Sequence, residues 1–217
     1  NCGSENYDLL TRTKNAGTSG RRSLDVVMCR ECSLCYLNPQ PTREMYAAYY
    51  RTYGRKNRPR EALIKEKYDQ RQYIDLLEKH LNKSSKILDV GCGKGIFLSF
   101  FKEKGFENLS GIDLSEDEIR FANKEFRLNT EYAAIESYEK KDFDLVTLIA
   151  TIEHYTDPRE SLKAVRRTLK DGGLLFISTP NIQKMILRKG VSNYFKFVHT
   201  FYVSMTTLKS IVRQVGF

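Results

Sequence analysis

The sequence lacks the long apolar run that a membrane-spanning helix needs, since no stretch approaches about 20 consecutive apolar residues. Its first residues also lack the pattern of a secretion signal. With 41% hydrophobic and 29% charged residues, the 217-residue chain is typical of a soluble globular protein. We therefore expect a cytoplasmic protein with one α/β domain and an appendage, and no membrane span.

The sequence also lacks a starting Met and a natural stopping point. It begins on Asn1 and ends on "RQVGF", a phrase typical of the middle of a domain. We expect the natural chain to continue at both ends. The sequence predicts nothing about the oligomeric state.

Acidic residues are scarce in the N-terminal part of this basic chain. The formal net charge is +9, and residues 1–60 hold 11 Lys+Arg against 5 Asp+Glu. Basic segments attract RNA, anionic lipid or phosphorylated substrates. A merely solvated basic surface explains the same excess, and we favour that interpretation.

Cysteines are few and unevenly placed. Four of the five lie in the first 35 residues, at Cys2, Cys29, Cys32 and Cys35, and the fifth is Cys92. In a chain without an export signal, clustered cysteines indicate a metal site before disulfides.

Three consecutive regions differ in their pattern. Two β-like runs at 6–10 and 24–29 flank a polar stretch and predict a hairpin. Residues 61–82 carry apolar side chains at helical spacing and predict one amphipathic helix. We therefore divide the chain into a cysteine-containing ribbon-like segment at 1–42, a helical linker at 43–84, and a main domain at 85–217.

The main domain alternates strand and helix patterns. The expected strands are 86–90, 109–114, 129–135, 143–150 and 173–179, and the expected helices are 94–105, 115–126, 157–172 and 204–214. This alternation predicts an α/β fold, a Rossmann-like, doubly wound and mostly parallel sheet with helices on both faces.

The first of these strands leads into three alternating glycines, Gly91, Gly93 and Gly95. The dinucleotide-binding motif G-x-G-x-x-G is not present, because Ile96 occupies the position of its third glycine. The strand also carries Asp89, whose carboxylate repels a pyrophosphate and favours a cation. The second strand ends at Asp113, an acid suited to accept hydrogen bonds from ribose hydroxyls. These features favour S-adenosylmethionine (SAM), which has a cationic sulfonium and a ribose.

Four phrases in order carry a resemblance to a known family: "ILDVGCGKGIFL", "SGIDLSEDEIRFA", "FDLVTLIATIEHYTDP" and "LKDGGLLFISTPN". They resemble the class I SAM-dependent methyltransferases from about residue 60 to the end. The resemblance implies SAM as the cofactor and S-adenosyl-L-homocysteine as the product. It implies that the cofactor contacts Asp89, Gly91, Cys92, Gly93, Gly95, Asp113, Leu114, Ile135, Ala150 and Ile152, with Cys92 serving in packing. The family fold closes with two further strands, which we expect beyond the end of this sequence.

Two histidines are candidates for the catalytic chemistry. In "TIEHYTDP", His154 follows Glu153 directly after the fourth strand. Quinone-type and sugar-type O-methyltransferases have a similar phrase, which makes His154 the first candidate for a general base. The alternative is that His154 only orders its loop. His199 resembles a histidine in a C-terminal substrate loop of related enzymes.

Two absences bear on the methyl acceptor. The Asn/Asp-Pro-Pro-aromatic phrase of base-amine methyltransferases is missing after the fourth strand, and so is the nucleophilic cysteine of cytosine-C5 enzymes. We therefore expect a small or carrier-linked acceptor such as a sugar, lipid or quinone precursor. An RNA methyltransferase that uses the basic N-terminal segment, and a SAM-binding module without catalysis, remain the alternatives.

The stretch "CRECSLCYLNPQPT" suggests that Zn²⁺ is a second ligand. Some bacterial class I methyltransferases begin with a similar zinc ribbon, and by that resemblance Cys2, Cys29 and Cys32 are ligands. The fourth ligand either precedes residue 1 or is Cys35. We favour a structural role for this zinc site, in which the ion stabilises the short N-terminal segment, over a role in recognising a substrate or partner.

Overall fold

The computed structural model describes residues 2–12, 24–42, 45–46, 70–189, 195 and 198–217. These residues belong to two compact units, each assembled from separate stretches of the chain. One unit comprises Asn1–Tyr53, Ala150–Lys163 and Thr179–Phe217, and the other comprises Gly54–Ile149 and Ala164–Ser178. The linear division at 1–42, 43–84 and 85–217 stays a prediction.

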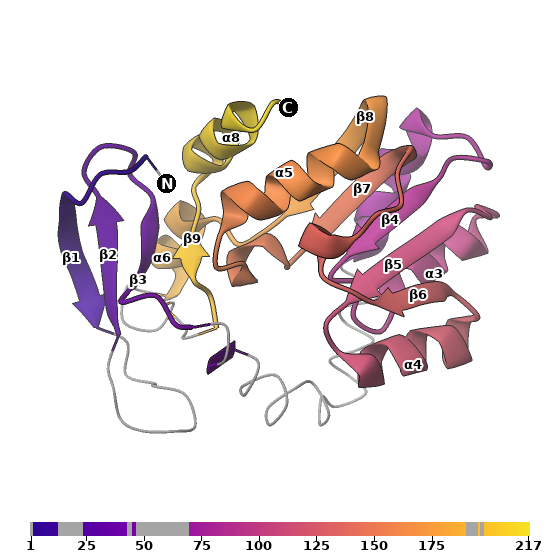
Figure 1. The fold of residues 1–217 in the computed structure, drawn as a ribbon, viewed down its shortest axis with the longest axis horizontal. Helices are drawn as coiled ribbons and strands as arrows, with labels where there is room; N and C mark the ends of the chain where they lie inside the picture. The colour runs from indigo at the N-terminus through magenta and orange to yellow at the C-terminus, as the bar shows by residue number, and fades with distance from the viewer. Residues whose placement is uncertain (1, 13–23, 43–44, 47–69, 190–194, 196–197) are drawn as a thin grey trace. The chain divides into compact units, whose positions relative to one another are not determined.

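The second unit is built on a five-stranded parallel sheet. Its strand order is β6-β5-β4-β7-β8, and every neighbouring pair is parallel (Figure 1). The strands are β4 (Ile87–Val90), β5 (Leu109–Asp113), β6 (Asn129–Tyr132), β7 (Phe143–Ile149) and β8 (Leu169–Ser178). This arrangement confirms the predicted Rossmann-like fold class.

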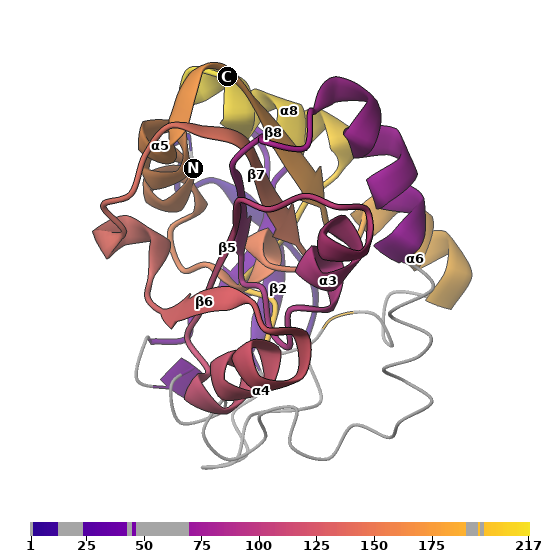
Figure 2. The ribbon, with the colours of Figure 1, turned by 90° about the vertical axis from the view of Figure 1, so that its right-hand side faces the viewer.

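Helices connect these strands. They are α3 (Ile96–Glu103), α4 (Glu116–Phe126) and α5 (Pro158–Thr168). Figure 2 shows α4 beside β6, in agreement with their contacts. The strand order moves outward from β4 to β6 and then returns to β7 on the other side of β4. A doubly wound sheet of this kind binds ligands at the carboxyl ends of its strands, where the order reverses.

The central strand β4 is apolar because both faces of the sheet are covered. All four of its residues are buried, including the acid Asp89. The helical residues 70–77 contribute Ile74 and Leu77 to the same core, and α3 contributes its phenylalanines. The one-turn helix η1 (Glu78–His80) ends this helical stretch. Residues 61–69 of the predicted amphipathic helix lie outside the described residues.

The predicted end of the third long helix is wrong. We expected the helix to stop at Gly172, but α5 ends at Thr168 and β8 begins on the next residue. Leu169 pairs with Phe143 of β7, and the register then shifts before Leu174. Gly172 lies inside this irregular strand with a φ of +72°, a backbone conformation that glycine adopts without strain.

The first unit contains a four-stranded sheet of order β1-β2-β3-β9. Strands β1 (Tyr7–Arg12) and β2 (Asp25–Cys29) form the predicted hairpin, whose tip lies outside the described residues. Strand β3 (Cys35–Asn38) pairs with β9 (Phe201–Tyr202), from the far end of the chain. The ribbon-like segment is therefore completed by a C-terminal strand, a pairing that the local sequence pattern does not predict.

The core of this sheet joins both ends of the sequence. Val26 and Leu37 of the hairpin sheet pack with Ile182 and Tyr202 in one buried cluster. Helices α6 (Ile182–Lys189) and α8 (Met205–Gln214) belong to the same unit. A capping box between Ser204 and Thr207 starts α8 at the predicted place. Within the described ranges, none of the helices combines the length and apolar character that a bilayer crossing requires.

Candidate functional site

A buried carboxylate lies near the carboxyl end of the central strand. Asp89 is the third residue of β4, and it accepts a hydrogen bond of 2.6 Å from Thr147 Oγ1 on the neighbouring β7. Burial raises the pKa of Asp89 to about 7; the hydrogen bond from Thr147 opposes this shift and the charge of Asp113 adds to it. A cation beside Asp89 would stabilise its ionised form.

The glycine loop follows directly and is tied to the end of β5. The backbone N–H groups of Gly91 and Cys92 both donate to Ile112 O, at 2.8 and 3.0 Å. Gly91, Gly93 and Gly95 have φ values of +74°, +51° and +70°, which side chains rarely adopt. The alternating glycines thus build a tight turn between β4 and α3.

Gly95 also meets a steric limit. A Cβ atom at this position would lie 2.6 Å from Leu128 Cδ1 and 2.9 Å from Ala122 Cβ.

Cys92 is buried, and its Sγ would lie 2.9 Å from a Cβ at Gly111. Burial raises the pKa of the Cys92 thiol well above its ordinary value. This environment supports the interpretation of Cys92 as a packing residue.

Asp113 ends β5 and its carboxylate is oriented by backbone. Gly93 N donates to Asp113 Oδ2 at 2.8 Å, and Ser115 N donates to Oδ1 at 2.9 Å. A carboxylate has about four lone-pair positions, so each oxygen can still accept from a ribose hydroxyl. The next residue, Leu114, is 64% exposed and offers an apolar surface beside this acid.

The donor set around this loop fits SAM. Asp89 and Asp113 lie on adjacent parallel strands, with Asp89 opposite Gly111 in the register. Two carboxylates beside a glycine turn suit a ligand that carries a positive charge and a ribose, whereas a pyrophosphate would meet two like charges. The side chains of Ile135 and Ile152 are almost fully buried. Ala150 follows β7 directly and has a φ of +50°.

Both candidate catalytic histidines meet in the first unit. His154 ends the short helix η3 (Ile152–His154), and its ring centroid lies 4.9 Å from that of His199. Each of Glu153, His154 and His199 offers one donor atom, and these atoms lie within 4.8 Å of one another. Glu153 is buried, and its Oε2 accepts a hydrogen bond of 3.0 Å from Thr179 Oγ1.

The segment around His199 is held against η3 by main-chain contacts. Thr200 N and Oγ1 donate to Glu153 O at 2.9 and 3.0 Å. Thr200 Oγ1 also contacts Tyr155 O. His154 Nδ1 lies 2.8 Å from Val198 O. The positions of His154 and His199 are thus coupled.

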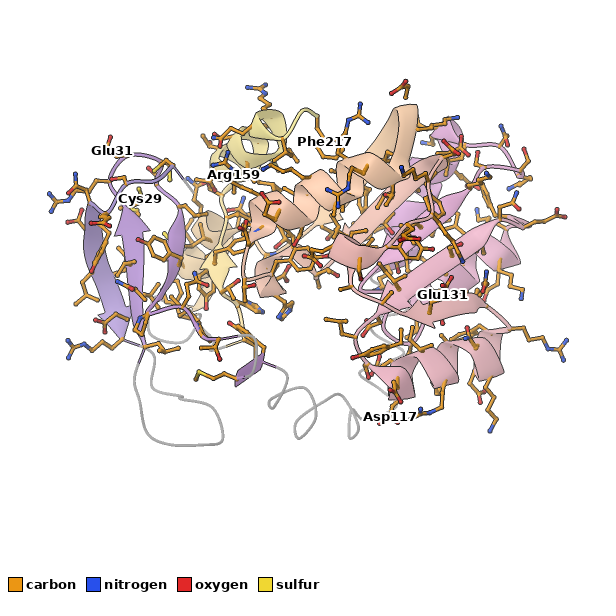
Figure 3. All side chains as sticks on the ribbon, in the orientation of Figure 1. Cys29, Glu31, Asp117, Glu131, Arg159 and Phe217 are labelled. Atoms are coloured by element: carbon orange, nitrogen blue, oxygen red, sulfur yellow. The ribbon has the colours of Figure 1, made fainter. Side chains whose placement is uncertain are left out.

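Three cysteines form a second cluster. Donor atoms of Cys2, Cys29 and Cys32 lie within 4.8 Å of one another, and the Sγ atoms of Cys2 and Cys29 are 3.5 Å apart. Figure 3 shows Cys29 and Glu31 at the end of the sheet where β2 turns toward β3. Burial opposes ionisation of Cys29, but hydrogen bonds from backbone groups of Cys32 and Glu31 lower its pKa overall.

Cys35 differs from these three cysteines. It is 3% exposed, belongs to the buried apolar cluster of the first unit, and is absent from the group of mutually close donors among the described residues. Burial raises the pKa of its thiol to about 11. The structure therefore gives Cys35 the environment of a core residue.

Sequence reasoning missed Thr147 and Thr179, which hold the carboxylates of Asp89 and Glu153. Threonine is common in and near strands, so neither position carries a local signal. Both contacts arise only when separate stretches of the chain come together.

Comparisons with known proteins agree with this geometry. A family model described as a methyltransferase domain matches residues 63–217. Ubiquinone biosynthesis O-methyltransferases from Idiomarina loihiensis and Hydrogenovibrio crunogenus are 32% and 35% identical over 118 residues. These matches cover 50% and 51% of this chain and 48% of each relative, so the chain spans about half the length of the curated relatives it matches.

Solved structures show the same fold. A SAM dependent methyltransferase from Archaeoglobus fulgidus is 30% identical, with a TM-score of 0.59, and the match covers 78% of this chain and 74% of that one. A possible histamine N-methyltransferase from Thermotoga maritima is 21% identical, with a TM-score of 0.55 and coverages of 80% and 76%. The second likeness concerns the fold alone.

Proposed function

The chain belongs to the SAM-dependent methyltransferases, and from this premise we propose that it methylates a hydroxyl oxygen of a small or carrier-linked metabolite. The observation that carries the methyl-transfer part of the proposal is the glycine turn flanked by Asp89 and Asp113 at the carboxyl ends of adjacent strands, whereas the choice of acceptor rests on the relatives. The names of the relatives in ubiquinone biosynthesis make a quinone-like acceptor our first candidate. Sugar and lipid precursors follow it.

The residues around the glycine turn are proposed to hold the cofactor. Asp89, Gly91, Cys92, Gly93 and Gly95 would surround its methionine part. Asp113 would bind the ribose, and Leu114 and Ile135 would contact the adenine. Ala150 and Ile152 would form the floor of the pocket. The burial of Ile135 and Ile152 supports a wall-forming role for their side chains. When bound, SAM supplies an electrophilic methyl group.

The histidine cluster is proposed to activate the acceptor. His154 follows Ile149, the last residue of β7, by five positions. A hydroxyl acceptor needs a base or a metal ion to lose its proton. Among the described residues, we propose His154, with His199 beside it, for that task, either as the base itself or as a ligand of a metal ion.

The cysteine cluster is proposed to be a structural Zn²⁺ site that stabilises the N-terminal segment. Cys2, Cys29 and Cys32 supply three thiolates, and the backbone hydrogen bonds to Cys29 favour its ionised form. The burial of Cys35 in the apolar core speaks against its use as the fourth ligand. A reducing compartment such as the cytoplasm would keep these thiols available for metal.

One experiment tests the reaction and the acceptor together. The protein is incubated with methyl-labelled SAM and separate quinone-lipid, water-soluble and RNA fractions of a bacterial extract. Label is expected in a small-molecule or lipid product, and it should be lost in Asp113→Asn and kept in Asp171→Asn, a change at an exposed carboxylate. Label in RNA, with salt-dependent RNA binding, would support the RNA alternative instead. Tight SAM binding without transfer to any fraction would indicate a non-catalytic module.

A further inference from the structure

Two of the three histidines in the chain share one place with a buried carboxylate. Glu153 and His154 come from η3, whereas His199 comes from the segment before β9. The donor atoms of the three residues lie within 4.8 Å of one another. Chain folding thus brings two imidazoles and one carboxylate together, which are three side chains of the kinds that bind metal ions.

The hydrogen bonding of His154 determines which ring nitrogen carries the lone pair. Its Nδ1 lies 2.8 Å from Val198 O, and a carbonyl oxygen can only accept. Nδ1 therefore carries the hydrogen, and the lone pair of the neutral ring is on Nε2. Metal-binding histidines have this same arrangement, with the second nitrogen donating to a carbonyl or carboxylate.

The frame around the three side chains is held at several points. Thr200 donates from N and Oγ1 to Glu153 O, and Thr179 Oγ1 donates to Glu153 Oε2. The rings of His154 and His199 meet at an interplanar angle of 86°. A hydrogen-bonded ligating carboxylate and oriented imidazoles are the supports that precise metal sites require.

We propose that Glu153, His154 and His199 bind a divalent transition-metal ion, separate from the zinc of the cysteine cluster. Two nitrogens and one carboxylate suit Zn²⁺, Mn²⁺, Fe²⁺ or Co²⁺. Ligand atoms that all lie about 2.1 Å from an ion are about 3–4 Å apart, so small side-chain adjustments close the observed spacing. Three protein ligands leave open coordination positions, as catalytic metal sites do.

The role of this ion deepens the proposed function and rests on it. An acceptor hydroxyl bound to the ion would ionise more readily, as metal-bound water does. The acceptor then loses its proton to solvent and its oxygen forms the new bond to the methyl carbon. The bond between that carbon and the sulfur of the cofactor breaks, and its electron pair stays on sulfur. The metal site itself is tested by binding, without any turnover.

Cobalt is the probe that separates the two metal sites. The full chain is stripped with a chelator under reducing conditions and titrated with Co²⁺. Cobalt on the thiolates of Cys29 and Cys32 gives intense sulfur-to-metal charge-transfer bands in the near ultraviolet. Cobalt on nitrogen and oxygen ligands gives only weaker visible bands. Bound cobalt per chain is counted by equilibrium dialysis alongside the spectra.

Besides any cobalt on the cysteine cluster, we expect one cobalt per chain that gives no thiolate bands, and this ion should be lost in His154→Ala and in His199→Ala. The matched control is His80→Ala, which changes the third, exposed histidine and should keep this ion. Thermal unfolding of each variant shows that the loss does not come from misfolding. His199→Ala with the same cobalt count and spectrum as the wild type would overturn the proposal, and so would cobalt bound on thiolates alone. Cobalt binding without methyl transfer would leave the site standing and reject only its catalytic role.

Discussion

Replacement of Asp89 by Asn should stabilise the free protein and weaken cofactor binding. Asp89 is buried in β4, and burial raises its pKa from 3.8 to about 7. The folded state therefore holds this proton more tightly than the unfolded state does. For an acid with a raised pKa, the free energy of unfolding falls as the pH rises from about 4 through about 7. A pKa difference of this size is worth about 4 kcal/mol, because one pKa unit is worth about 1.4 kcal/mol.

The Asp89→Asn substitution would remove this pH dependence without removing the main contact. Asn has nearly the same shape as Asp, and its carbonyl oxygen can still accept the hydrogen bond from Thr147 Oγ1. The variant should be more stable than the wild type at pH 8, and its advantage should be about 2.5 kcal/mol smaller at pH 5. SAM binding should weaken by about ten- to a hundredfold, because a charge-assisted hydrogen bond contributes about 1.5–3 kcal/mol.

The assay is urea unfolding of the cofactor-free protein at pH 5, 6, 7 and 8, combined with calorimetric titration of SAM at pH 8. Asp171→Asn is the matched control, since the same chemical change is made at an exposed carboxylate. A stability difference between Asp89→Asn and the wild type that stays constant from pH 5 to pH 8 would refute the linkage argument. Unchanged SAM affinity in Asp89→Asn would refute the proposed role of its charge.

Three further predictions concern packing, capping and metal. Gly95→Ala should lower the free energy of unfolding by about 2–4 kcal/mol in urea titrations, because the new Cβ would lie 2.6 Å from Leu128 Cδ1 and φ is +70°. Gly105→Ala is the control: its φ is +83° but the space around it is open, so the free energy of unfolding should fall by only about 1–2 kcal/mol. Equal losses of stability in the two variants would contradict the predicted clash at Gly95. Ser204→Ala should cost about 1 kcal/mol and Ser204→Gly less, measured the same way, because Ser204 caps α8. Cys29→Ser should lower the zinc content measured by elemental analysis by one ion per chain, and an unchanged zinc content would reject the cysteine site.

The parallel sheet was predictable because its signals are local. Strands β4, β5 and β7 and the second half of β8 are short and largely apolar, and the helices between the strands have their own periodicity or cap, whereas β6 is polar and is recognised mainly by its place in the alternation. Ser115 illustrates such a signal, since its side chain accepts from Glu118 N as the capping-box pattern predicts. The end of α5 was predicted wrongly because Gly172 carries a positive φ in a strand irregularity as readily as at a helix end.

The candidate site was predictable to the extent that its residues are adjacent in sequence. Asp89 and the glycines form one continuous phrase, and Asp113 ends the next strand. The hydrogen bond of Asp89 to Thr147 depends on the pairing of β4 with β7, whose register no local pattern specifies. The raised pKa of Asp89 could not be derived before its burial and this partner were known.

The pairing of β3 with β9 bears on two questions that the sequence left open, the role of Cys35 and the role of His199. Cys35 lies opposite Tyr202 in this pairing, and its side chain belongs to the buried apolar cluster and not to the group of three close cysteines. Cys35→Ala should therefore keep the bound zinc and lose stability through packing, whereas a true ligand would lose both. The same stretch of chain carries His199 two residues before Phe201 and brings it to His154. A contact between residues so distant in sequence has no local signature, so the second metal site that we propose could be inferred only from the folded chain.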